Sequence, residues 1–311
     1  MKNREWSTLI IVWMILVAIL SLAATLIPME NELFGFDWKV FFSEPKNIPG
    51  HYPPWTALVL NPLTYPLLIG VTLATFIILV FRKQASIWSA IMSFMTFPLF
   101  WVIFLGQLDG LTLLGIIGFH LALMVPQTKQ YLKRGLIAVA ASFILIKPQV
   151  AAFALFARKE YFKAGVVIVA ASFVFWGLWP LNMLDYYEAH TASADPWVQD
   201  IGLGWRGLPV FLFVLWKMPK HDTDWWMLAG AFITPTLIPY HLLPLMPAIS
   251  RLRPWFAAAV ALSTWLPLTS IWLGPNAWNL TWVSLLLLGF GLAYEKRKTG
   301  DLVPRLSGNI R

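Results

Sequence analysis

The chain has 311 residues, of which 59% are hydrophobic, 15% aromatic and only 12% charged, with a formal net charge of +8. Apolar runs of about 20 residues recur from end to end, which excludes a soluble globular protein. The positive charge does not indicate nucleic-acid binding, because Lys and Arg occur in short clusters that flank the apolar runs, as in cytoplasmic loops. The absence of cysteine excludes disulfides and thiol chemistry.

The first third of the sequence predicts three membrane-embedded units. The N-terminal apolar run is too long for the core of a signal peptide, so we expect it to remain as a helix. A later run is too long for one span and is interrupted by Gly106-Gln107-Leu108-Asp109-Gly110, which predicts a hairpin with its tip outside. The expected order is a helix over 7–27, an external loop over 28–55, a helix over 56–81 and this hairpin over 87–125.

Two later segments predict broken pairs of short helices. Residues 135–157 are interrupted at Lys147-Pro148-Gln149, and residues 225–250 are interrupted at Pro239-Tyr240-His241. Each half is shorter than the roughly 20 residues that a normal span needs. Neighbouring helices or a water-filled cavity must therefore shelter the free backbone groups at each break.

The remaining segments complete an all-α, polytopic membrane protein with about twelve membrane-embedded segments, some of them short and paired. We expect a single transmembrane domain over residues 1–294 and a cytoplasmic tail over 295–311, with both termini cytoplasmic. The other expected elements are helices over 164–181, 207–216, 255–273 and 277–294 and a second external loop over 182–206.

The charges agree with this topology, which places 19 of the 23 Lys and Arg residues inside and 9 of the 15 acids outside. The basic residues left on the outer side are candidates for binding an anionic ligand, and they are Lys39, Lys46, Lys147 and Arg206.

Three helix interruptions and both large loops converge on the external face, where we place the candidate active site. Asp37 lies between Phe36 and Trp38, so its carboxylate is expected to be partly desolvated, as a general base requires. The alternative is a solvated loop acid. One well-placed acid with several cations suits the transfer of a group from a lipid phosphate.

The other candidates also have structural interpretations. Lys147 could extend its ammonium group to the membrane interface, Arg206 could anchor the next helix, and His241 could bond a freed carbonyl group. His120 is alone in an apolar helix and is expected to be a satisfied core histidine. Asp222-Thr223-Asp224 matches a metal-binding Asp-x-Asp signature, but the basic residues beside it place it inside, opposite the candidate site.

An ordered set of short motifs resembles the integral-membrane GT-C glycosyltransferases, and most of all glycosyltransferase family 87, which includes polyprenol-phosphate-mannose-dependent mannosyltransferases. The resemblance covers roughly residues 30 to 250. Its motifs are Phe36-Asp37-Trp38, His51-Tyr52-Pro53-Pro54, Asn61-Pro62-Leu63, Gly106-Gln107-Leu108-Asp109, Ile146-Lys147-Pro148-Gln149 and Pro239-Tyr240-His241.

The resemblance implies a GT-C-like helical bundle in the cell membrane that moves mannose or a similar hexose on its external face. The implied donor is a polyprenyl-phosphate sugar, the acceptor is a lipid or glycan of the cell envelope, and the transfer inverts the sugar without a metal or another cofactor. Asp37 is the implied base. We expect Lys147, His241 and Arg206 at the donor phosphate and Tyr52, Gln107, Asp109 and Gln149 at the substrate.

Two other functions remain open. Broken helices and buried cations also occur in transporters, so a transporter or flippase for a lipid-linked or anionic solute is the main alternative. No internal repeat of the kind that many transporters contain is visible in the sequence. A noncatalytic membrane scaffold is the third possibility, and it predicts that Asp37→Asn has no effect on biological activity.

Overall fold

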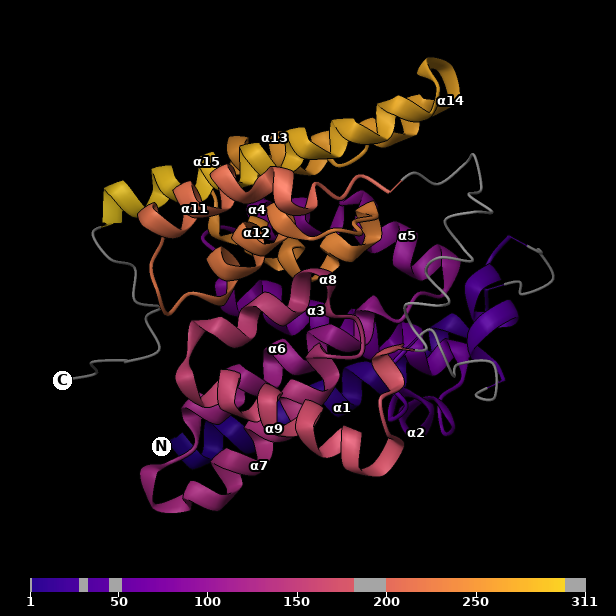
Figure 1. Ribbon diagram of the computed structural model, residues 1–311, viewed down its shortest axis with the longest axis vertical. Helices are drawn as coiled ribbons and strands as arrows, with labels where there is room; N and C mark the ends of the chain where they lie inside the picture. The colour runs from indigo at the N-terminus through magenta and orange to yellow at the C-terminus, as the bar shows by residue number, and fades with distance from the viewer. Residues whose placement is uncertain (1, 28–32, 45–51, 182–199, 300–311) are drawn as a thin grey trace.

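The computed structural model describes residues 2–27, 33–44, 52–181 and 200–299, and these residues form helices and no β-strand. The all-helical class expected from the sequence is therefore confirmed. Figure 1 shows the start of α1 and the end of α15 on the same side of the molecule. The expected tail over 295–311 lies mostly outside the described residues, since α15 extends to Thr299.

The N-terminal helices form a close pair. α1 (Lys2–Ala24) packs along α3 (Tyr65–Lys83), and Trp13 Nε1 donates a hydrogen bond to Thr75 Oγ1 at 2.9 Å. Between them lie a π-helix, η1 (Trp38–Phe42), and the short α2 (Thr56–Leu60). The single helix expected over 56–81 is interrupted, because Thr64 caps the start of α3 through its hydroxyl group and Pro66 follows in the first turn.

The turn expected within residues 87–125 is present, but the arm before it is bent and packs mainly on η6 (Pro239–Arg251) rather than along the second arm. α4 (Ile87–Phe94) and α5 (Phe97–Leu105) meet at an angle of 41°. Pro98 explains the bend, because it lacks the N–H that would continue the helix and its ring would clash with the carbonyl group of Phe94. After the turn, α6 (Asp109–Met124) forms the second arm.

The break expected at Lys147-Pro148 is present. α7 (Gln130–Ile144) ends three residues before Lys147, and α8 (Pro148–Ala151) begins directly after it. A short 3₁₀-helix, η3 (Gln127–Lys129), precedes α7, the 3₁₀-helix η4 (Ala152–Ala157) continues α8, and α9 (Lys159–Trp176) follows.

The second expected break lies earlier than the sequence suggested. α12 (Thr223–Ile233) ends before an irregular stretch over 234–238, and Pro239–Arg251 then forms a long 3₁₀-helix, η6. Pro244 and Pro247 inside η6 prevent regular α-helical hydrogen bonding, which accounts for the 3₁₀ form. Before α12 lie the 3₁₀-helix η5 (Gly204–Gly207) and α11 (Leu208–Lys217).

The C-terminal segments pack across the rest of the bundle, at the top of Figure 1. α13 (Pro254–Ser263) packs against α15 (Thr281–Thr299) and α4. Between α13 and α15 lie three short elements, η7 (Leu266–Thr269), α14 (Ser270–Leu273) and η8 (Pro275–Leu280).

Few of the described helices are long enough to cross a membrane alone. Four described segments are long and apolar enough to cross a membrane, and the bent pair over 87–105 makes a fifth if it counts as one span. The expected count of about twelve embedded segments is not confirmed, because most of the other apolar helices are short. These four segments are Trp6–Ala24, Tyr65–Lys83, Pro254–Leu273 and Pro275–Lys296.

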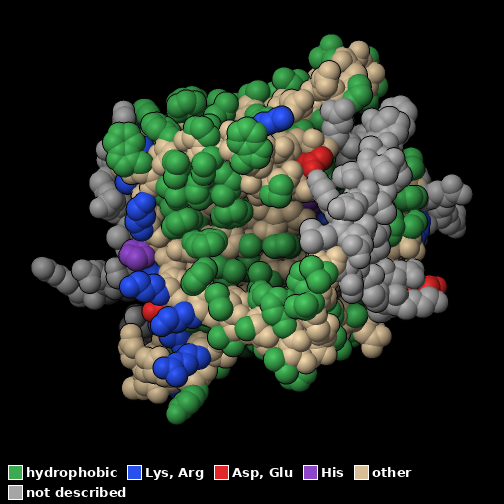
Figure 2. Space-filling model, viewed as in Figure 1, with side chains coloured by type: hydrophobic (Ala, Val, Ile, Leu, Met, Phe, Trp, Pro, Cys, Tyr) green, Lys and Arg blue, Asp and Glu red, His purple; other side chains and the backbone are tan. Residues whose placement is uncertain are grey.

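The surface has an apolar belt and a basic edge. Figure 2 shows apolar side chains over most of the visible face, whereas most of the visible Lys and Arg side chains gather along its left edge. The start of α1 and the end of α15 lie at this same edge in Figure 1. An apolar surface bordered by a basic edge is consistent with a membrane protein.

Candidate functional site

The loop that carries Asp37 is fixed to the turn between α5 and α6. Gly35 N–H donates to the Phe104 carbonyl oxygen at 2.7 Å, and the Trp38 and Tyr65 rings stack with their centroids 6.1 Å apart. Gly106 has a φ of 77°, and a Cβ atom there would lie 2.7 Å from the Cβ of Trp38. A glycine is therefore required at this turn for its backbone conformation and for the close approach of the loop.

Four polar side chains from separate elements form a connected chain, here named the Asp37 network. Gln107 Nε2 donates to Asp37 Oδ2, and Lys147 Nζ donates to Gln107 Oε1 at 2.6 Å. Lys147 Nζ also lies 3.0 Å from Asp109 Oδ2. The members come from the loop over residues 33–44, the turn before α6, the start of α6 and the break before α8, and the last three are buried.

Two tyrosine rings enclose the Lys147 ammonium group. Its Nζ lies 4.7 Å from the centroid of the Tyr240 ring and 5.6 Å from that of Tyr52. Both distances allow cation–π attraction, which is strongest where water is excluded. The side chain of Lys147 is 4% exposed, so it does not extend to the interface, which was the structural alternative for this residue.

His241 and Tyr52 border the network, whereas Gln149 has a less defined role. The rings of Tyr240 and His241 meet edge to face at 4.6 Å, and His241 Nδ1 accepts a hydrogen bond from the Ile238 N–H at 3.2 Å. Gln149 Oε1 is buried without a hydrogen-bond partner among the described residues. Its backbone oxygen accepts from Thr234 Oγ1 at 2.6 Å, which joins the two helix breaks.

Arg206 is not part of the network. Its side chain is exposed, and its guanidinium carbon lies 6.0 Å from the centroid of the Trp205 ring. Its element is nevertheless fixed beside the second break, because Gly204 N–H donates to the Thr234 carbonyl oxygen at 3.2 Å. The element that carries Arg206 therefore lies beside Thr234, where the irregular stretch before His241 begins.

The sequence did not assign roles to three residues that build the site. Tyr240 covers Lys147, Tyr65 donates through its hydroxyl to the Ile103 carbonyl oxygen, and Asp200 Oδ1 accepts from the Leu237 N–H at 2.6 Å. The position of Tyr240 beside a proline break was a usable signal. The other two depend on contacts between distant segments, for which the sequence holds no local pattern.

Asp37 is half-buried, and its surroundings act on its ionisation in opposite directions. Burial raises the pKa of the Asp37 carboxyl above its usual value, whereas the charge of Lys147 and the hydrogen bond from Gln107 lower it. The sequence-based expectation of a partly desolvated carboxylate is therefore confirmed. A raised pKa makes Asp37 a stronger base than an ordinary aspartate as long as it remains ionised.

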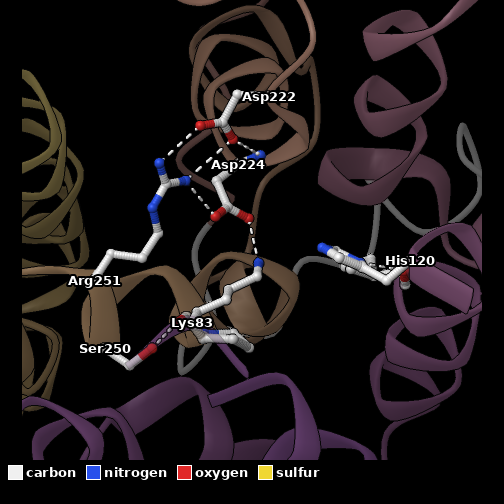
Figure 3. Close-up of polar contacts among 8 residues, drawn as sticks. Lys83, His120, Asp222, Asp224, Ser250 and Arg251 are labelled. Carbon is white, nitrogen blue, oxygen red and sulfur yellow. Dashed lines mark hydrogen bonds and ion pairs between the residues drawn. The ribbon is translucent and has the colours of Figure 1, made fainter. Parts of the chain in front are cut away.

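A second network of charged side chains, here named the Lys83 network, lies at the other end of α3. Arg251 pairs with Asp222 and with Asp224 at 2.8 Å each, and Lys83 Nζ lies 2.6 Å from Asp224 Oδ1. Figure 3 shows Arg251 beside both acids, with Lys83 meeting Asp224 from below. Burial alone raises the pKa of Asp224, but Lys83 and Arg251 outweigh it and hold that pKa below its usual range.

Asp222 and Asp224, the two acids of the Asp-x-Asp motif, belong to the Lys83 network. Their charges are therefore neutralised by the Lys83 and Arg251 side chains. The described residues contain no group of three or more acidic or histidine side chains arranged to hold a metal ion. His120 stands apart from these four side chains in Figure 3, and its Nδ1 contacts the Ile116 carbonyl oxygen at 2.8 Å. It is a satisfied histidine inside a helix, as the sequence suggested.

The two networks are separated by the length of α3. Tyr65, at its first residue, packs on the loop of Asp37, whereas Lys83, at its last, pairs with Asp224. A helix of 19 residues rises by about 28 Å, close to the thickness of the hydrocarbon core of a bilayer. The two networks therefore lie near opposite ends of one helix that is long and apolar enough to cross a membrane.

Neither protein-family models nor curated proteins nor solved structures gave a match to this chain. The functional argument therefore depends on the residues and their geometry.

Proposed function

We propose that this protein is a membrane glycosyltransferase that uses a polyprenyl-phosphate sugar, with mannose or a similar hexose, on the external face of the cell membrane. The acceptor is a lipid or glycan of the cell envelope. One observation carries the proposal: a half-buried acid, Asp37, accepts a hydrogen bond from Gln107, which a buried lysine holds in place.

The chemistry follows from the position of Asp37. Its carboxylate takes the proton of the acceptor hydroxyl group, and the acceptor oxygen forms a bond to the anomeric carbon of the sugar. The bond from that carbon to the phosphate oxygen breaks, and its electron pair leaves with the polyprenyl phosphate. A single displacement of this kind inverts the configuration at the anomeric carbon.

The departing phosphate needs hydrogen-bond donors or cations. Because Nδ1 of His241 accepts from the Ile238 N–H, a neutral His241 carries its proton on Nε2 and can donate it to a phosphate oxygen. Arg206 can supply the positive charge, since its guanidinium is exposed on an element fixed beside the same break. Lys147 is already engaged by Gln107 and Asp109, so we do not place it on the phosphate.

Tyr52 and Gln149 remain candidates for substrate contact. Tyr52 lies at the edge of the network, with its ring 5.5 Å from that of Phe42. A ring in this position can stack on a sugar, and the unpartnered Gln149 oxygen can accept a hydrogen bond from a sugar hydroxyl group. Gln107 and Asp109 hold the network together, which favours a role other than direct sugar binding.

The test is reconstitution of the purified protein in lipid vesicles with a polyprenyl-phosphate-mannose donor and a membrane-lipid extract as the source of acceptor. We expect polyprenyl phosphate to be released only when the extract is present, and the sugar to be transferred with inverted configuration. Transbilayer movement of the intact donor without cleavage would support the transporter alternative. If the donor is neither cleaved nor moved across the bilayer, the result would favour a scaffold.

A further inference from the structure

The amide group of Gln107 has only one orientation that satisfies both of its neighbours. Lys147 carries N–H donors and no acceptor, so it must face the amide oxygen, Oε1, at 2.6 Å. The amide nitrogen, Nε2, then necessarily faces the carboxylate of Asp37. If the amide were flipped, its N–H groups would face an ammonium group and its oxygen would face a carboxylate, so both hydrogen bonds would be lost.

Asp109 holds Lys147 in the position that this orientation requires. Its carboxylate lies 3.0 Å from Lys147 Nζ, and both side chains are almost completely buried, at 2% and 4% exposed. A buried lysine without an acid partner would lose its charge or find another position. The Tyr52 and Tyr240 rings further restrict where the ammonium group can lie.

We propose that Lys147 and Asp109 are positioning residues, whose ion pair orients the Gln107 amide so that its NH₂ group holds the Asp37 carboxylate ready to accept a proton. Lys147 and Asp109 thus act on Asp37 through Gln107 and do not bind the donor phosphate. The catalytic meaning of this relay depends on the proposed transferase function, but the relay itself is a property of the four side chains.

The relay predicts a measurable effect on the ionisation of Asp37. The titratable groups around it include Tyr52, Asp109, Tyr240 and the cation Lys147, and Lys39 and Glu44 lie in the same described loop. Because the Gln107 donor and the Lys147 charge both lower the pKa of Asp37, their loss raises it. A base with a raised pKa becomes protonated at higher pH, so the acid limb of a pH–rate profile moves upward.

The first experiment is an infrared titration of the carboxyl groups in the purified protein, with Asp37→Asn used to assign the band of Asp37. Gln107→Met removes the amide donor at similar size, and Gln107→Glu places a second carboxylate against Asp37. We expect the midpoint of Asp37 to rise by about one pH unit in the first variant and further in the second. An unchanged midpoint in both variants would overturn the relay.

The lysine needs a variant that leaves no unpaired buried charge. Lys147→Met combined with Asp109→Asn removes the pair together, and its Asp37 midpoint is also expected to rise. Glu44→Gln, which removes an exposed acid from the same loop, is the matched control and should leave the midpoint unchanged. An unchanged midpoint in the double variant of a folded protein would remove Lys147 from the relay.

Transfer kinetics separate the relay from a phosphate-binding role. With the polyprenyl-phosphate-mannose donor, the relay predicts that Gln107→Met and the double variant lower kcat and move the acid limb upward, while the KM for donor changes by less than about twofold. A strongly raised donor KM with an unmoved acid limb would instead make Lys147 a phosphate ligand and contradict the relay. Shifted Asp37 midpoints without any transfer would support the relay and reject the proposed reaction.

Discussion

The two charge networks at the ends of α3 differ in how completely their acids are paired. In the Lys83 network, two acids meet two cations, and both oxygens of Asp224 are engaged by Lys83 and Arg251. In the Asp37 network, two acids share the single cation Lys147, which lies against Asp109. Among the described residues, Asp37 receives one hydrogen bond, from a neutral amide.

This difference separates a structural clamp from a reactive site. A buried acid that is paired with as many cations stays ionised, and its oxygen atoms are already engaged by those cations. An acid that accepts a hydrogen bond from a neutral donor still has free lone pairs that can accept a proton. The opposite directions of the two pKa values agree with this division, since that of Asp224 is lowered and that of Asp37 is raised. The contrast favours Asp37, and not the Asp-x-Asp motif, as the chemical centre.

The largest expected effect concerns the side of the membrane on which each network lies. Single cysteines at Ser43 and Asn276 should react with an impermeant thiol reagent in intact cells, because both positions are exposed and belong to the external side of the proposed topology. Cysteines at Ser86 and Thr128 should react only after permeabilisation. If cysteines at Thr128 and at Ser43 were both labelled from outside, the two positions would lie on the same side of the membrane. The proposal that the two networks face opposite sides would then be contradicted.

The next largest effect is on stability. Asp224→Asn removes the acid that Lys83 and Arg251 share, and it should lower the free energy of unfolding by about 3–5 kcal/mol, the range for removing one partner of a buried ion pair. Thermal unfolding of the variant and of wild type in lipid nanodiscs measures this loss of stability. An unchanged unfolding temperature would show that the Lys83 network is not a clamp.

Protonation of Asp224 should weaken the Lys83 network only at low pH. Because the folded pKa of Asp224 is lowered, its stabilising contribution is fully present above its unfolded pKa of about 3.9 and disappears as pH falls through the lower, folded value. The difference in unfolding temperature between wild type and Asp224→Asn should therefore be constant from pH 7 to about 5 and shrink below about 4. A difference that already shrinks between pH 7 and 5 would contradict this ionisation.

The smallest effect is expected from Asp37→Asn on stability. Because the folded pKa of Asp37 is raised, its ionisation at neutral pH opposes folding, so removing the charge should leave the protein equally stable or slightly more stable. The change should lie within about 1 kcal/mol of wild type, since Asn can still accept the Gln107 hydrogen bond. A loss as large as that of Asp224→Asn would mean that Asp37 is itself a structural acid.

The sequence predicted the parts of the fold that depend on local chemistry. Proline after Lys147 marked the first break, and the glycines around Gln107 marked the turn of the hairpin. The break before Pro98 was missed because the run continues through it without a charged residue or a glycine, and Ser93 and Thr96 are its only polar side chains there. The expected number of membrane-embedded segments is not confirmed, since hydrophobicity alone does not separate a lipid-facing helix from a short helix sheltered by others.

The sequence predicted which residues form the candidate site better than it predicted their roles. Asp37, Gln107, Asp109 and Lys147 were all named from the sequence, and the structure joins them in one network. That Gln107 would lie between Lys147 and Asp37 could not be predicted, because this depends on three segments far apart in the chain. Lys46, a candidate for binding an anionic ligand, and His51, part of one motif, lie outside the described residues.

The most direct test of the account is the transfer rate of Asp37→Asn, measured with saturating polyprenyl-phosphate-mannose and compared with Glu44→Gln from the same loop. The amide keeps the shape of Asp37 but cannot take the acceptor proton, so transfer should fall by at least about 10²-fold while donor binding and stability stay near wild type. Glu44→Gln should retain most of the activity. Normal transfer by a folded Asp37→Asn would contradict the central claim that Asp37 is the base.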